Sequence, residues 1–347
     1  GEIDSFTIAL SSGDRIRLRV VETSGNLVAR REISRPNGTT LCSGFSPDLT
    51  CQADTNGTFT VKISGNSTTT GSYSLYVQRL NGPAGCSAVS FGAAATTSIG
   101  AAVEHDCYTM SLNAGDRVRV RAVETSGALI AFREILRPNG TTLCSGFSPD
   151  LTCLIDINGT HTVLIRDNTI NTGSYGFYAQ QLNNPAGCSA VSFGAVAQAS
   201  IGAAVEHDCY TMTLSAGDRV RVRAVETSGA LIAFREILRP NGTTLCSGFS
   251  PDLTCLIDIN GTHTVLIRDN TDNTGGYGFY AQRLNNPAGC STISFGQTLA
   301  RAIGAAVEHD CYTVSLSAGD QVRVRAVETS GALIAFRELL RPNGTTL

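Results

Sequence analysis

The sequence has 347 residues, more than the about 100–150 residues of a typical compact domain, so about two to four domains are expected. The net charge of −3 gives no field strong enough to recruit nucleic acid or an anionic membrane, and no apolar run of about 18 residues predicts a membrane-spanning helix. Twelve cysteines without a Cys-x-x-Cys spacing argue against zinc ribbons and thioredoxin-like sites, and predict structural disulfides in a secreted or cell-surface protein.

The sequence repeats itself with a period of 102 residues, the spacing between Cys42, Cys144 and Cys246. The stretch SGFSPDLTC recurs unchanged at the same interval. Solenoid units are only about 20–50 residues long, so this period predicts one domain per repeat. The predicted modules are residues 1–82, 84–184, 186–286 and 288–347, with the first incomplete at its N-terminal end and the last at its C-terminal end.

The modules are joined by short segments rich in Pro and Gly. These tethers are predicted at Asn81–Gly85, Asn183–Gly187 and Asn285–Gly289, each after the last predicted strand of a module. Links this short hold neighbouring modules close together, which favours a semi-rigid rod over a flexible string.

Within a module every predicted element is a β-strand. In Asp116–Glu124 the small apolar residues Val118, Val120 and Ala122 alternate with three arginines. This period of two is typical of a half-buried antiparallel strand, with the apolar residues facing a core. No amphipathic helix of any length is predicted.

Further strands follow in chain order. Ala128–Leu136 is one, and Thr152–Ile157 and Thr160–Ile165 flank Asn158-Gly159, a dipeptide that favours a type I′ hairpin turn. The last strand is Tyr175–Leu182. About seven to nine short strands at this spacing predict a two-sheet structure. The expected fold is therefore all-β, with tandem antiparallel β-sandwich modules of jelly-roll-like type, each of about 102 residues and stapled by disulfides.

The cysteine pairing follows from the first module. Ser5 stands where later modules have Cys107, Cys209 and Cys311, and the segment that would carry the equivalent of Cys86 is also missing there. Because both cysteines are lost together, they are predicted to be partners. The predicted disulfides are Cys86–Cys107, Cys188–Cys209 and Cys290–Cys311, with Cys42–Cys51, Cys144–Cys153 and Cys246–Cys255 closing small loops.

Several motifs recur in each module and carry a family resemblance. They are Asp106 and Tyr108 in HDCYTM, Ala114–Asp116 before RVRVRAV, Arg137–Gly140, Asn158–Thr160 before HTVLIRD, and Thr172–Tyr175. In these motifs the chain resembles the bacterial pre-peptidase C-terminal (PPC) domains, small β-sandwiches appended to secreted peptidases and other exported proteins. Related collagen-binding modules hold calcium with an acidic segment, but no such cluster precedes Asp106, so the resemblance implies no calcium site here.

No catalytic residue and no cofactor are predicted. Ser46, Ser148 and Ser250 lie in GFSP, which is half of a nucleophile-elbow motif. Proline follows each serine and the second glycine of the motif is missing, so a disulfide-closed loop is the better interpretation. The sequence therefore predicts that this chain is not an enzyme.

No metal site is predicted either. The histidines that could contribute ligands are His105, His161, His207, His263 and His309. The alternative, which we favour, is that they are surface residues of strands. Asp269–Asn273 is rich in oxygen ligands, but Ile170 replaces one acid in the preceding module, which favours a polar strand connection.

Arginines recur on the polar face of one strand in each module and form a possible interface. They are Arg117, Arg119 and Arg121, then Arg219, Arg221 and Arg223, then Arg323 and Arg325. Guanidinium groups bind carboxylates through two hydrogen bonds, so Glu124, Glu134 and their copies could meet the arginines across a module interface. The alternative is a solvated sheet face.

The leading functional hypothesis is an extracellular structural protein that forms a stalk, surface layer or filament. Contacts that repeat along one chain can repeat between chains, so self-association is the expected partnership. A first alternative is a multivalent adhesin that binds matrix protein or polysaccharide weakly at each module. A second alternative is a passive spacer of a secreted enzyme.

Overall fold

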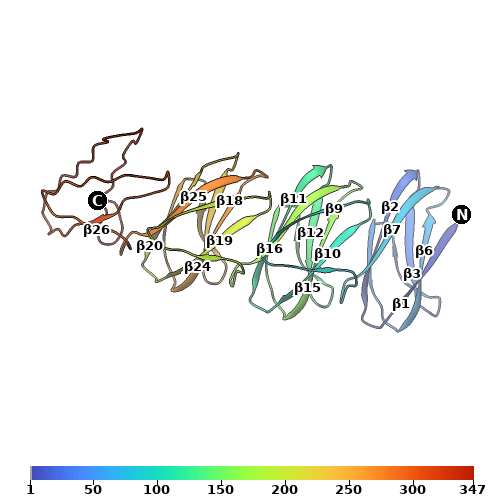
Figure 1. Cartoon of the computed structure of the whole chain (residues 1–347). Helices are drawn as coiled ribbons and strands as arrows, with labels where there is room; N and C mark the ends of the chain where they lie inside the picture. Colours follow the sequence, from blue (N-terminus) through green and yellow to red (C-terminus); the bar gives the residue numbers. More distant parts are fainter. Residues whose placement is uncertain (1) are drawn as a thin grey trace. The chain divides into compact units, whose positions relative to one another are not determined.

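The computed structural model describes residues 2–347, and this part of the chain is all-β with 27 strands and no helix (Figure 1). None of the described residues therefore forms a helix that could cross a membrane. The predicted fold class is confirmed: antiparallel sheets recur in the first three repeats, and disulfides recur with them. We refer to the predicted modules 1–82, 84–184, 186–286 and 288–347 as repeats 1 to 4.

Repeat 2 shows the full set of strands. In chain order they are β8 (Ser87–Ala88), β9 (Ala94–Ile99), β10 (His105–Leu112), β11 (Arg117–Gly127), β12 (Ala131–Leu136), β13 (Thr142–Gly146), β14 (Asp150–Leu154), β15 (Gly159–Asp167) and β16 (Gly173–Gln181). They form one sheet of order β13-β12-β15-β10-β8 and a second of order β14-β11-β16-β9. All pairings are antiparallel except the short parallel pair of β8 with β10.

Repeats 1 and 3 follow the same plan. Repeat 1 contains β1 (Ile3–Leu10), β2 (Arg15–Gly25), β3 (Ala29–Ser34), β4 (Thr40–Gly44), β5 (Asp48–Gln52), β6 (Gly57–Gly65) and β7 (Gly71–Arg79). Repeat 3 contains β17 (Ser189–Ala190), β18 (Val196–Ile201), β19 (His207–Leu214), β20 (Arg219–Glu226), β21 (Ala233–Leu238), β22 (Thr244–Gly248), β23 (Asp252–Leu256), β24 (Gly261–Asp269) and β25 (Gly275–Arg283). The sheets of repeat 1 have the orders β1-β6-β3-β4 and β5-β2-β7.

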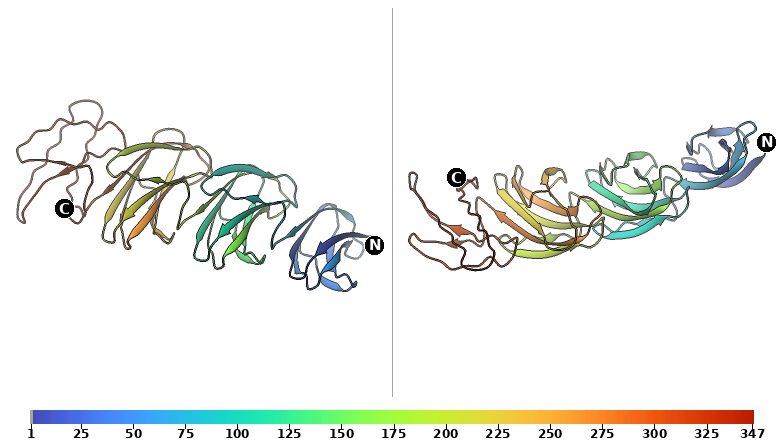
Figure 2. Two further views of the ribbon diagram at one scale, coloured as in Figure 1. Left: turned by 60° about the horizontal axis from the view of Figure 1, so that its bottom comes forward. Right: turned by 90° about the horizontal axis from the view of Figure 1, so that it is seen from above.

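Repeat 4 has little regular structure. Its strands in the described chain are β26 (Ser291–Thr292) and β27 (Tyr312–Thr313), which pair in parallel, and one isolated bridge joins Leu340 to Thr346. Figure 2, where this repeat is coloured dark red, shows it as mostly irregular backbone, in contrast to the regular strands within repeats 1 to 3.

A hydrophobic core fills the space between the two sheets of each regular repeat. In repeat 2, Val118, Val120 and Ala122 of β11 are fully buried against Ile135 of β12 and Val163 of β15. The alternation predicted for Asp116–Glu124 is therefore present, with the valines inward and the arginines on the outer face. Burying a valine or isoleucine side chain contributes about 1.5–3 kcal/mol, so this face fixes the register of the strand.

The predicted hairpin at Asn158-Gly159 is wrong. β14 pairs with β11, whereas β15 pairs with β10 and β12, so the segment between them crosses from one sheet to the other. A type I′ turn needs two positive φ angles, and among the described residues only Ser67 has a positive φ without being glycine. The crossing is held instead by Asn158, whose Oδ1 accepts a hydrogen bond from the Ala114 backbone N at 2.7 Å, and by Ile155, which is buried in the core.

Six disulfides join the same cysteine pairs that the repeat pattern predicts. They are Cys42–Cys51, Cys86–Cys107, Cys144–Cys153, Cys188–Cys209, Cys246–Cys255 and Cys290–Cys311. In repeat 2, Cys144 lies on β13 and Cys153 on β14, so this bond ties the two sheets together. Cys86 lies directly before β8 and bonds to Cys107 of β10, which fastens the start of the repeat to the sheet β13-β12-β15-β10-β8.

The chain divides into two compact units at residues 181 and 182. The first unit holds repeats 1 and 2, and the second holds repeats 3 and 4. This division falls at the end of β16, next to the predicted tether Asn183–Gly187. The four module boundaries themselves stay predictions.

Candidate functional site at a repeat junction

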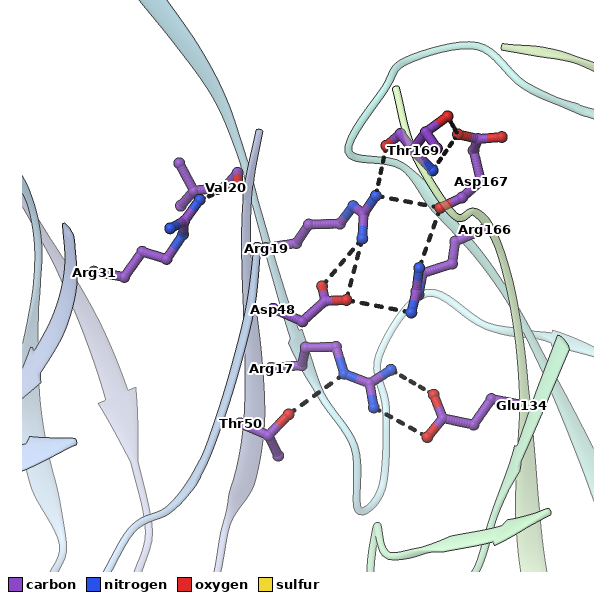
Figure 3. A network of polar contacts seen from close by, with 10 residues as sticks. All are labelled: Arg17, Arg19, Val20, Arg31, Asp48, Thr50, Glu134, Arg166, Asp167 and Thr169. Atoms are coloured by element: carbon purple, nitrogen blue, oxygen red, sulfur yellow. Dashed lines mark hydrogen bonds and ion pairs between the residues drawn. The ribbon is translucent and has the colours of Figure 1, made fainter. Parts of the chain in front are cut away.

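Two outward sheet faces meet where repeat 1 contacts repeat 2. On β2 the apolar residues point into the core of repeat 1, so Arg17 and Arg19 point outward, as Asp48 does from β5. On repeat 2 the same alternation places Glu134 of β12 and Arg166 of β15 on the outer face. These residues meet side chain to side chain, and we call their contact the repeat junction (Figure 3).

Arg17 and Glu134 form a buried ion pair with two hydrogen bonds. Arg17 Nη1 donates to Glu134 Oε2 at 2.6 Å, and Nη2 donates to Oε1 at 3.0 Å. Burial lowers the pKa of Arg17, but the bonds to Glu134 more than offset this, so the pKa is raised overall. Burial raises the pKa of Glu134, and the bonds from Arg17 and Thr142 hold it below its usual value. Both groups are therefore charged at neutral pH.

Arg19 and Asp48 extend the same junction. Arg19 Nη1 donates to both oxygens of Asp48, and its Nη2 donates to the backbone carbonyls of Asp167 at 3.2 Å and Thr169 at 2.9 Å in repeat 2. Arg166 of repeat 2 lies 3.3 Å from Asp48 Oδ2. Charges and hydrogen bonds thus cross the junction in both directions (Figure 3).

An apolar contact accompanies the ion pairs. Leu80, which directly follows β7 of repeat 1, is 2% exposed and packs against Leu136 and Leu164 of repeat 2. The turn at Gly140 lies against it: a Cβ at that position would lie 2.9 Å from the Leu80 Cβ, and Gly140 has a φ of +76°. Glycine is therefore required there both by space and by backbone conformation.

A buried histidine lies in the same interface. The His105 ring packs on Tyr76 of repeat 1, with 4.8 Å between ring centroids, and Tyr76 Oη donates to the His105 carbonyl at 3.3 Å. His105 is 4% exposed, and neither ring nitrogen has a hydrogen-bond partner in the described chain. Burial, followed by the charges of Arg17, Arg166 and Arg19, holds the pKa of His105 well below its usual value, so the ring is neutral at pH 7.

The same arrangement recurs within the second unit, between repeats 3 and 4. Arg221 donates two hydrogen bonds to Glu338, at 2.8 and 3.2 Å, with the same spacing of 117 residues as Arg17 and Glu134. His309 packs on Tyr280, with 5.1 Å between centroids. The repeat junction is thus encoded by the repeated sequence.

The structure places the predicted arginines in different environments. Arg119 and Arg121 are buried, Arg117, Arg219, Arg221 and Arg223 are half-buried, and Arg323 and Arg325 are exposed. The alternative of a solvated sheet face is therefore wrong for Arg119 and Arg121. Arg121 Nη1 donates to Asp150 within its own repeat, at 3.2 Å to Oδ1.

Of the two predicted acidic partners, only Glu134 reaches across the junction. Glu124 stays within its own repeat, where it accepts a hydrogen bond from the Ala131 backbone N at 3.0 Å and contacts Arg133 at 3.5 Å. It lies near the end of the strand where β11 bulges, away from the arginines of the neighbouring repeat. The idea that Glu124 meets the arginine row is therefore wrong.

Some junction residues were missed by the sequence interpretation. Arg17 and Arg19 occupy the same register positions as Arg119 and Arg121, so the 102-residue period alone could have found them. Leu80 recurs as Leu182 and Leu284 by the same rule. Nothing in the local pattern marks them as interface residues, because an arginine on an outward strand position is equally compatible with solvent.

The other candidate residues have structural surroundings. His105, His161, His207 and His263 are buried, which corrects their interpretation as surface residues, and His309 is half-buried. His161 lies on the core-facing side of β15, in alternation with Val163 and Ile165, so strand periodicity could have shown its burial. His105 lies on the outer side of β10, and its burial depends on Tyr76 of repeat 1, which the local pattern does not reveal. Among residues 2–347 no three His, Cys, Asp or Glu side chains gather as a metal site would require.

The Asp269 carboxylate is taken up by its own turn. It accepts hydrogen bonds from the backbone N of Ile232, Thr271 and Asn273 at 2.6–3.1 Å, which lower its pKa although burial acts to raise it. The loop thus uses this acid to close a strand connection.

No protein-family model matches this chain, and no curated protein matches it. Solved structures similar to it include PliG, a periplasmic inhibitor of g-type lysozyme from Aeromonas hydrophila, at 12% identity over 27% of this chain and 96% of that one, with a TM-score of 0.23. The CUB1-EGF-CUB2 region of human MASP-1/3 matches at 9% identity over 54% of this chain and 99% of that one, with a TM-score of 0.18. Tripeptidyl peptidase 2 matches at 7% identity over 82% of this chain and 34% of that one, also with a TM-score of 0.18. Likenesses this low carry no argument about function.

Proposed function

We propose that this chain is an extracellular structural protein whose tandem sandwiches form a stalk, a surface layer or a filament. The observation that carries this proposal is the repeat junction between repeats 1 and 2, where Arg17 and Glu134 are both almost fully buried. Breaking such a pair leaves an uncompensated buried charge, which costs about 3–5 kcal/mol. A chain that fixes its neighbouring modules in this way is suited to bearing load along its length.

The extracellular location is supported by the six disulfides, since such bonds persist in oxidising compartments. We also propose a relationship to the PPC domains. In its support, two residues from the motifs that carry the resemblance are bonded to each other: Tyr175 Oη donates to Asp106 Oδ2 at 2.5 Å inside the sandwich of repeat 2.

A second candidate function is a multivalent adhesin, and one recurring feature favours it. Phe45, Phe147 and Phe249 are each about half exposed, at 50%, 50% and 51%, on the loops closed by the small disulfides. Identical exposed aromatic rings on successive repeats are suited to weak binding that gains avidity from repetition. Loss of adhesion to matrix protein or polysaccharide in a chain with all three replaced by serine would favour this function.

Electron microscopy of the native extracellular material, with an antibody against this chain, tests the leading proposal. We expect antibody-labelled ordered fibres or layers with a spacing of one or a few modules, each about 35 Å across for a domain of one hundred residues. Labelled material that consists only of separate flexible strings would refute the structural role.

A further inference from the structure

The face of repeat 1 that corresponds to the junction face of repeat 2 has different residues. In the 102-residue register, Leu136, Leu164 and Cys107, which surround Leu80 in the junction, correspond to Ser34, Lys62 and Ser5. Repeat 3 keeps the leucines as Leu238 and Leu266, and these pack with Leu182 and Cys209. The apolar socket for the leucine of a neighbouring repeat is thus present in repeats 2 and 3 and absent from repeat 1.

The acidic residue of this face already has ion-pair and hydrogen-bond partners within repeat 1. Glu32 corresponds to Glu134, but Lys62 Nζ lies 3.3 Å from its Oε1, Arg30 Nη1 lies 2.8 Å from its Oε2, and Ser34 Oγ donates to Oε1 at 3.0 Å. Burial raises the pKa of Glu32, but the bonds from Ser34 and Lys62 and the charge of Arg30 hold it below its usual value. Repeat 1 therefore supplies its own cations where repeat 2 receives the guanidinium of a neighbour.

The change of charge opposes docking. A guanidinium that approached Glu32 as Arg17 approaches Glu134 would meet Lys62 and Arg30, and like charges brought together without solvent repel each other. Ser64 stands where Arg166 contacts Asp48, so that cross-junction ion pair is also lost. Lys62 is the only lysine of the sequence, and it lies at the centre of this altered face.

We propose that the outer face of the sheet β1-β6-β3-β4 is a cap that does not accept another repeat, whether from this chain or from a second copy of it. Ser34, Lys62 and Arg30 determine this property, whereas repeat 2 has Leu136 and Leu164, which receive Leu80, at the positions of Ser34 and Lys62. End-to-end stacking of separate chains through this face is thereby prevented. The inference goes beyond the proposed function and rests on the repeat junction alone.

The first test transplants the cap residues into repeat 2 of the full chain. Repeat 1 shows that the sandwich folds with these residues. Leu136→Ser with Leu164→Lys should therefore leave the hydrophobic cores of repeats 1 and 2 intact. We expect proteolysis of the tether Asn81–Gly85 to rise about a hundredfold or more. Leu80 loses the two leucines that it packs against, and a cation enters the apolar socket. The control is Leu154→Lys with Ile157→Ser, which changes two exposed residues of the same repeat, 53% and 45% exposed, in the same way.

Hydrogen exchange in β11 and β15 shows whether repeat 2 remains folded in the variant. Tether cleavage that rises while this exchange stays slow supports the cap. If cleavage matches that of the control, the residues do not decide stacking, and the inference is overturned. If the variant unfolds repeat 2, these residues are not interchangeable between repeats, which also overturns it.

The second test uses Lys62 as a reporter in the unmodified chain. Its side chain is 37% exposed, and peptide mass spectrometry separates its labelling by an amine-reactive reagent from that of the N-terminal amine. We expect Lys62 to react at the same rate in dilute solution and in concentrated or fibrous material. Protection of about tenfold or more in the concentrated material would show a repeat docked on the face and overturn the cap.

The two tests separate the cap from the proposed function. Fibres in which Lys62 is protected would leave the structural role standing and refute the cap. Accessible Lys62, together with tether cleavage in the transplanted variant, would support the cap even if the native material contained no fibres.

Discussion

Replacing Glu134 by alanine should weaken the junction between repeats 1 and 2 strongly. The Glu134 side chain is 5% exposed and that of Arg17 10%, so the substitution leaves a buried guanidinium without its carboxylate. It also removes the acceptor of Thr142 Oγ1, which donates to Glu134 at 2.5 Å. Removing one partner of a buried ion pair costs about 3–5 kcal/mol, and we expect a loss of this size in the free energy that couples the two repeats.

Native-state hydrogen exchange of the full chain measures this loss. In tandem repeats each unit is stabilised by its neighbour, so a weaker junction lowers the free energy of unfolding reported by the slowest amides of β10 and β15. Repeats 3 and 4 carry the equivalent pair, Arg221 with Glu338, and serve as an internal control whose exchange should not change.

A double-mutant cycle separates the energy of the interaction between Arg17 and Glu134 from the cost of burying their charges. Arg17→Met combined with Glu134→Leu replaces both charges by apolar groups, and such replacements are often neutral or stabilising. The double variant should therefore recover most of the loss, with a coupling energy of about 2 kcal/mol or more. The ion pair would not hold the junction if Glu134→Ala left the exchange of repeats 1 and 2 unchanged. The same would follow if the loss of free energy in the double variant equalled the sum of the losses from Arg17→Met alone and Glu134→Leu alone.

Three further predictions concern other parts of the molecule. His105→Phe should keep the contact with Tyr76 and reduce the dependence of the thermal midpoint on pH between 7 and 5. Because folding lowers the pKa of His105 from 6.5, the wild-type junction loses stability as the pH falls below 6.5. A variant whose midpoint depends on pH as steeply as that of the wild type would contradict this. Leu80→Ala should cost about 2–5 kcal/mol of junction free energy by the same exchange measurement, and a loss below 1 kcal/mol would show that the leucine is not buried in solution. Replacing Cys86 and Cys107 by serine should destabilise repeat 2 by about 3 kcal/mol in denaturant unfolding, as expected for a loop of 21 residues, whereas an unchanged midpoint would contradict the bond.

The fold could be predicted largely from the sequence because its signals are local and repeated. Alternation in Asp116–Glu124 fixes which face of the strand is buried, and Ser5, which replaces a repeated cysteine in the first repeat, points to one set of disulfides. The hairpin at Asn158-Gly159 was mispredicted because its two flanking runs look alike in sequence. Which sheet a strand joins depends on distant partners, here β11 for one run and β10 and β12 for the other.

The repeat junction was only partly predictable. The arginine row and Glu134 are visible as a repeated pattern, and complementary charge suggests that they meet. Burial of Arg19 depends on carbonyl groups of Asp167 and Thr169, which lie in the neighbouring repeat about 150 residues away. The change at Lys62 becomes informative only when the structure shows that Leu164, its counterpart, receives Leu80.

The rigidity of the repeat junction is the central claim, and NMR relaxation of backbone amides in the full chain tests it most directly. If the buried ion pairs hold repeats 1 and 2 together, amides of β2 and β15 should report one common rotational correlation time. The Glu134→Ala variant should then give two shorter times. Separate and shorter correlation times for repeats 1 and 2 in the unmodified chain would contradict the account, because the junction would not restrain the modules in solution.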